Sequence, residues 1–172
     1  MKRLVLVALL LISAVACNEK TAPPSNQASA VQSSQLQSIL SLSRPAQPKS
    51  VKDAANPKPA PGSSIVVTGR VGGTKKPIGD FACLTLVQGD MPNCREEGGM
   101  PNCPTYWDLC CSDLRDKICT IQVMKDGKLL RATLRGLGGL KEMSSITVSG
   151  KVSTAENGVL VIDAEQIFID KP

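Results

Sequence analysis

The 172-residue chain contains no histidine, and it has only four aromatic residues: Phe81, Tyr106, Trp107 and Phe168. The absence of histidine excludes Ser-His-Asp and Cys-His catalysis, because both need an imidazole as the general base. The chain also lacks a P-loop and a G-x-G-x-x-G motif, and its acidic residues form no evident catalytic pair. We therefore expect a protein that is not an enzyme and that uses no cofactor.

An excess of positive charge is missing from the C-terminal two thirds of the chain. Residues 63–172 contain 13 basic and 13 acidic residues, whereas residues 1–62 contain seven basic and two acidic ones. Surfaces that bind nucleic acid concentrate positive charge, and single-strand binders add several stacking aromatics. The composition of residues 63–172 therefore predicts no nucleic-acid partner.

Long apolar runs are also absent, and the one short run lies at the N-terminus. Leu4 to Ile12 is an apolar stretch of nine residues, preceded by Lys2 and Arg3 and followed by small residues up to Cys17. A membrane-spanning helix needs about 20 apolar residues, so this run is too short to cross a bilayer. A charged start, a short apolar centre and small residues at the end are typical of a cleaved export signal.

The segment AVAC at positions 14–17 resembles the lipobox of bacterial lipoproteins, with Ala14 in place of the usual leucine. The resemblance implies a signal peptide over residues 1–16, lipidation of Cys17 and a membrane anchor of several acyl chains. Because Asn18 is not the aspartate that retains such proteins at the inner membrane, it favours the outer membrane, with the domain facing periplasm or surface. The alternative is an ordinary secreted protein.

Composition divides the mature chain into two parts. Residues 17–62 hold seven of the 12 prolines among Ser, Gln, Ala and Lys, which predicts a lipid anchor and a disordered tether. A short amphipathic helix within Val31–Leu42 is the alternative for one part of it. Residues 63–172 alternate apolar and polar side chains at period two, which predicts strands.

We expect strands over Ile65–Val71, Phe81–Gln88, Ile118–Met124, Leu129–Arg135, Ile146–Ser153 and Val159–Ile169. Asp126-Gly127 and Asn157-Gly158 predict tight hairpins. Five to six short strands favour an all-β domain, a small barrel with a long cysteine-rich loop, and a β-sandwich is the alternative. The segments VTGRV at 67–71 and TVSGKV at 147–152 resemble strands of bacterial OB-fold modules, which implies an OB-fold-like barrel.

Residues 89–117 form a long loop with little strand or helix signal. An exported domain meets oxidising conditions, so its cysteines predict disulfide bonds. The candidates are Cys83, Cys94, Cys103, Cys110, Cys111 and Cys119. Cys83 and Cys119 fall in predicted strands and are expected to point inward, where they could bridge or pack as buried thiols.

Two other interpretations of the loop cysteines remain open. Cys94, Cys103, Cys110 and Cys111 could form a thiolate site for zinc, iron or copper, although their spacing lacks paired C-x-x-C motifs. Thiol redox chemistry is the third interpretation, but the sequence shows no C-x-x-C pair to lower a thiol pKa.

The centre of the loop, CPTYWDLCC at 103–111, resembles the CPTPWDYCC signature of exported proteins and lipoproteins of planctomycete-like bacteria. Tyr106 replaces the second proline of that signature and Leu109 its tyrosine, and the resemblance implies no known activity. Within the loop, Tyr106, Trp107 and Asp108 are the candidate contact surface, since an aromatic beside an acid can bind a sugar or a protein. Alternatively, Trp107 forms the small core of the loop. The sequence therefore predicts a non-catalytic, lipid-anchored module that contacts an envelope protein or glycan.

Overall fold

The computed structural model describes residues 34–96, 100–110, 112–153 and 159–172. Cys17, Cys111 and the Asn157-Gly158 turn lie outside the described residues. Within them, no helix is long and apolar enough to cross a membrane. The elements in chain order are β1 (Lys49–Ser50), α2 (Val51–Ala55), β2 (Ser64–Val71), β3 (Cys83–Val87), η1 (Tyr106–Asp108), β4 (Ile118–Gln122), β5 (Met124–Lys125), β6 (Lys128–Leu129), η2 (Leu137–Gly139), β7 (Ser145–Val152) and β8 (Leu160–Lys171).

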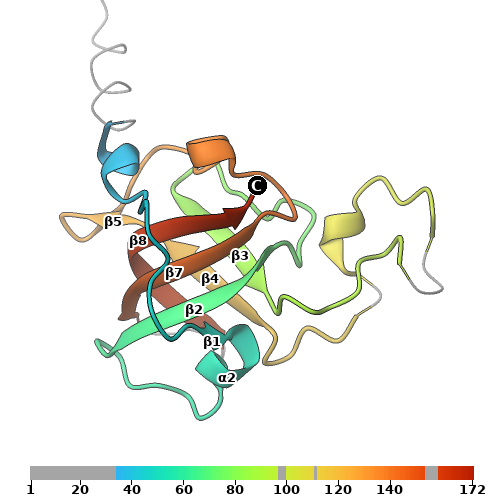
Figure 1. Cartoon of the computed structure of the whole chain (residues 1–172), viewed down its shortest axis with the longest axis horizontal. Helices are drawn as coiled ribbons and strands as arrows, with labels where there is room; N and C mark the ends of the chain where they lie inside the picture. The colour runs from blue at the N-terminus through green and yellow to red at the C-terminus, as the bar shows by residue number, and fades with distance from the viewer. Residues whose placement is uncertain (1–33, 97–99, 111, 154–158) are drawn as a thin grey trace, which may run out of the picture.

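Five strands close into a barrel (Figure 1). They pair in the order β2-β3-β4-β8-β7, and β7 pairs back to β2. All pairs are antiparallel except β4–β8, which is parallel. This is the strand order of the five-stranded Greek-key OB fold. The predicted small barrel is confirmed, and the alternative β-sandwich is wrong because the sheet closes on itself.

The barrel strands match the period-two prediction closely. In β2 the side chains of Ile65, Val67 and Val71 are buried and their neighbours are more exposed. The Asp126-Gly127 turn joins β5 to β6 with φ values of 50° and 72°. Positive φ at both central residues is the signature of the predicted tight hairpin.

The predicted strand Leu129–Arg135 is wrong beyond its first residue, because the chain leaves the sheet after β6. Leu130 hydrogen-bonds to Val123 and to Ala82 through its backbone, and the following residues turn inward. Leu134 and Leu140 are then fully buried in the barrel core. This segment closes one end of the barrel, and burial of these leucines outweighs continued strand pairing.

The predicted tether over residues 17–62 is wrong for residues 34–55, which pack on the barrel. We call residues 34–55 the N-terminal strap. Residues 34–38 are helical, in agreement with the alternative prediction of a short amphipathic helix within Val31–Leu42. Leu36 of this helical segment is buried. Farther along, β1 pairs in parallel with β2, and Figure 1 shows the strap crossing the barrel between these two points.

Helix α2 ends the strap and covers the barrel at the end opposite η2 (Figure 1). The Ser50 hydroxyl accepts a hydrogen bond from the Asp53 amide at 3.2 Å, which caps the first turn of the helix. Val51 and Ala54 are buried in the core. Both ends of the barrel are therefore covered by segments of the chain itself.

Candidate functional site

The cysteine loop between β3 and β4 has a small hydrophobic core of its own. Val87, Met91 and Leu109 are buried together, with Leu114 and Ile118 packed against them. Leu109 occupies the centre with no exposed surface, whereas Trp107 is only half-buried. The alternative that Trp107 forms the core of the loop is therefore wrong, because the neighbouring leucine takes that place.

The loop is also fixed to the barrel through its backbone. The Gly73 amide donates to the Trp107 carbonyl oxygen at 2.8 Å, and the Arg70 guanidinium donates to the Met91 carbonyl. A Cβ atom on Gly72 would lie 2.8 Å from the Trp107 carbonyl oxygen, so this approach requires glycine. The loop forms a lobe beside the barrel (Figure 1), and these contacts hold its base.

Two predicted contact residues form an ordered aromatic surface with a cation. In η1 the rings of Tyr106 and Trp107 meet edge to face, with centroids 5.3 Å apart. The guanidinium carbon of Arg95 lies 4.1 Å from the Tyr106 ring centroid, a cation–π contact. We call Arg95, Tyr106 and Trp107 the aromatic platform.

Hydrogen bonds fix the platform from both sides. Arg95 Nε donates to the Cys103 carbonyl oxygen at 3.0 Å, and Trp107 Nε1 donates to the Lys75 carbonyl oxygen at 3.2 Å. Arg95 is exposed, and the two rings are half-buried. Asp108, the third predicted contact residue, ends η1 and is half-buried beside them. Arg95 and Lys75 were not predicted from the sequence, because nothing in their local pattern indicates that they contact the aromatic residues.

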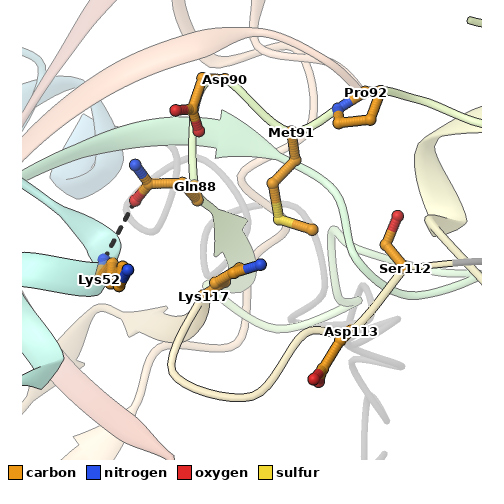
Figure 2. A pocket seen from close by; sticks show the side chains of 8 residues that line it. All are labelled: Lys52, Gln88, Asp90, Met91, Pro92, Ser112, Asp113 and Lys117. Carbon is orange, nitrogen blue, oxygen red and sulfur yellow. Dashed lines mark hydrogen bonds between the residues drawn. The ribbon is translucent and has the colours of Figure 1, made fainter. Parts of the chain in front are cut away.

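A groove of about 440 Å³ runs along the base of the loop (Figure 2). Its lining comes from α2 and the two ends of the loop: Lys52, Gln88, Asp90, Met91, Pro92, Ser112, Asp113 and Lys117. The Gln88 side-chain oxygen accepts from the Lys52 amide at 3.1 Å, which connects the strap to the loop. The groove therefore lies between the strap and the base of the loop.

Asp113 belongs to the lining of this groove, and its carboxylate is paired with Arg115. Its carboxylate receives hydrogen bonds from the Arg115 guanidinium, and these lower the pKa of Asp113 to about 2. Figure 2 shows the Asp113 carboxylate directed away from Met91 and the two lysines. Because the group is fully exposed, this ion pair is a local contact of little energetic weight.

Two of the loop cysteines lie close together. The Sγ atoms of Cys94 and Cys110 are 3.9 Å apart, although 15 residues separate them in the chain. Cys103 is a buried thiol in the same loop. No disulfide joins two cysteines of the described part of the chain, so the disulfide bonds inferred from the sequence stay a prediction.

The predicted bridge between Cys83 and Cys119 is wrong. Cys119 points into the barrel and has no exposed surface, whereas Cys83 is half-buried on the outer side of β3. Cys83 does share a face with Val87, as predicted, but that face is the outer one, and Val87 is buried there by the loop. Two thiols on opposite faces of a barrel wall cannot meet.

The alternative metal site also lacks support among the residues that the structure describes. No group of three or more Cys, Asp or Glu side chains in that part of the chain is placed to hold a metal ion. Cys94 and Cys110 supply two adjacent sulfurs, and Cys111 lies outside the described residues. The four-cysteine site therefore stays a prediction.

Comparison with known proteins identifies no family for this chain. No protein-family model matches the sequence, and no curated protein matches it. A crystal structure of a putative aspartyl-tRNA synthetase from Leishmania major Friedlin is similar in shape, with a TM-score of 0.44 and 11% sequence identity. The match covers 83% of this chain and 26% of that chain, so this protein spans about a quarter of the synthetase's length. The OB-fold assignment therefore depends on the strand order and pairing described above.

Proposed function

We propose that the protein is a lipid-anchored envelope protein whose barrel presents the aromatic platform as a non-catalytic contact surface for an envelope protein or glycan. The observation that carries this proposal is the fixed geometry of the platform. Tyr106 and Trp107 keep exposed ring surface, yet Arg95 and the Lys75 carbonyl hold them in one arrangement. A preorganised aromatic surface loses little entropy on binding.

The anchor in this proposal is Cys17, which the export-signal pattern supports. Residues 17–33 connect the proposed anchor to the strap. Seventeen residues reach at most about 60 Å when fully extended. The anchored barrel would therefore work close to the membrane surface, and partners within that distance are favoured.

The test uses the mature full-length chain, immobilised and exposed separately to solubilised envelope protein and to purified envelope glycan. We expect one fraction to bind the wild type and Trp107→Ala to weaken that binding at least ~10-fold, since a buried aromatic anchor is typically worth 2 kcal/mol or more. Phe81→Ala is the matched control, because Phe81 is 47% exposed at the other end of β3.

Both variants must first unfold at the wild-type temperature, which shows that the barrel is intact. If Trp107→Ala and Phe81→Ala bind as well as the wild type, the platform is not the contact surface. If both variants lose binding equally, the contact depends on general apolar exposure, and the proposed site is wrong.

A further inference from the structure

Cys94 and Cys110, whose sulfur atoms lie close together, flank the aromatic platform in the sequence. Between them lie the 15 residues Arg95–Leu109, which include the whole aromatic platform. The Cys94 amide also donates to the Tyr106 carbonyl oxygen at 3.3 Å, so the backbone is already drawn together at this point. A covalent bond between the two sulfurs would close the platform into a ring.

The geometry of the pair is compatible with such a bond. The Sγ atoms are 3.9 Å apart, and a disulfide requires about 2.05 Å, a difference that side-chain rotation on a loop can supply. Cys94 is 6% exposed, whereas Cys110 is exposed to solvent. One sulfur is therefore accessible to an external oxidant, and the other is positioned behind it to complete the reaction.

Cys83 and Cys119, two of the other cysteines in the described residues, are poorly placed to compete. Cys119 is enclosed in the barrel, where burial raises the pKa of its thiol to about 12. Cys83 lies on the outer face of β3, and burial, with Asp80 nearby, raises the pKa of its thiol as well. Both cysteines belong to barrel strands, and neither lies within the loop that carries Cys94 and Cys110.

We propose that Cys94 and Cys110 form a disulfide in the mature protein and that this bond fixes the aromatic platform. The inference rests on the proposed export of the chain, because the oxidising compartment outside the cytoplasm supplies the oxidant. The oxidant is a disulfide carried by another molecule of that compartment. The Cys110 thiolate attacks one of its sulfurs and releases one thiolate.

The mixed disulfide is then resolved within the loop. The Cys94 thiolate attacks the Cys110 sulfur, the intramolecular S–S bond forms, and the second oxidant sulfur leaves as a thiolate. The two cysteines lose two protons and two electrons in total, and the oxidant disulfide becomes two thiols. Reduction of the bond would release the platform from its covalent ring.

Peptide mapping of the wild-type mature chain under non-reducing conditions tests the bond directly. Cleavage after Met91 and after Arg95 yields a peptide, 92–95, whose only cysteine is Cys94. Cleavage before Asp108 and before Asp113 yields 108–112, which contains Cys110 and Cys111. We expect these two peptides to be linked, and fragmentation between Cys110 and Cys111 to place the bond on Cys110.

A bond from Cys94 to any other cysteine, or an alkylated Cys94 without a bond, would overturn the proposal. A stoichiometric metal retained by unbridged thiols would also overturn it in favour of the metal site. The mapping involves no binding partner and no membrane, so its result is separate from the outcome of the Trp107→Ala binding test.

The role of the bond in fixing the platform has its own measurement, the rate of tryptic cleavage after Arg95. We expect Cys94→Ser and Cys110→Ser to be cut at least ~10-fold faster than the wild type, since the loop would open more often. Cys83→Ser is the matched control and should be cut at the wild-type rate. Equal rates in all four proteins would show that the bond does not hold the platform.

Discussion

Cys119 illustrates how a single buried side chain connects stability to pH. It occupies the inner face of β4 with no exposed surface, and desolvation raises the pKa of its thiol from 9.0 to about 12. In the unfolded chain the thiol loses its proton near pH 9. Between these two values the unfolded state binds fewer protons than the native state, so the free energy of unfolding falls as pH rises.

We predict that this loss of stability disappears in Cys119→Ala. Between pH 9 and 11 the wild type should lose up to about 1.4 kcal/mol per pH unit more than the variant, in urea unfolding under reducing conditions. Below pH 8 the difference between the two proteins should be constant, since the thiol is then neutral in both states. A difference that stays constant up to pH 11 would contradict the assigned burial effect.

At the scale of elements, one extra residue in β8 reverses which of the following side chains face the barrel interior. Leu160, Ile162 and Ala164 are buried, and burial then resumes at Ile167 instead of position 166. The register with β7 shifts between Ser149 and Gly150, leaving Glu165 without an opposite residue. This β-bulge explains why β8 stays one strand although the sequence pattern is interrupted at Ala164 and Glu165.

The strap is the second element-level feature, and it is tied to the barrel along its length. Arg44 Nε lies 2.9 Å from Asp170 Oδ1 and 3.2 Å from Thr147 Oγ1. Thr147 is fully buried and donates to Asp170 Oδ2 at 2.8 Å. This network joins the strap to β7 and β8, and it satisfies a buried hydroxyl that would otherwise destabilise the barrel.

We therefore predict that the chain truncated to residues 63–172 is much less stable than the chain truncated to 34–172. Removing the strap exposes the core around Leu36, Val51 and Ala54, which corresponds to about 4 kcal/mol of lost apolar burial. The 34–172 chain is the control and should match the mature protein in urea unfolding. Equal stability of the two truncated chains would show that the strap is not part of the folded unit.

At the scale of the whole molecule, the strap changes the charge of the folded part. Residues 63–172 are neutral, but residues 34–172 contain 17 basic and 14 acidic residues, a net charge of +3. The additional lysines include Lys52, which lines the groove beside the loop. A modest positive charge favours anionic partners without providing the concentrated charge of a nucleic-acid surface.

The proposed anchor makes a prediction at this same scale. Replacing Cys17 by serine should move the protein from the membrane fraction to the soluble fraction, since the acyl chains supply the membrane affinity. Cys83→Ser is the control and should remain with the membranes. Retention of Cys17→Ser in salt-washed membranes would contradict lipid anchoring and point to another attachment.

The sequence by itself determined the features that depend on neighbouring residues. Period-two alternation located the five barrel strands, and Asp126-Gly127 specified its hairpin through backbone conformation. The loop over residues 89–117 was also predictable, because it lacks any repeating pattern between two clear strands. These patterns depend only on residues that are close in the sequence, so they can be recognised without knowing the tertiary structure.

Only the tertiary structure decided the features that depend on distant contacts. It showed that residues 34–55 pack on the barrel, that Cys83 faces outward, and that Leu109 instead of Trp107 fills the core of the loop. It also brought Arg95 to Tyr106 and Cys94 to Cys110. Burial and proximity arise from surfaces that meet across the fold, and a proline-rich segment with few apolar residues becomes ordered when the barrel supplies the surface it lacks.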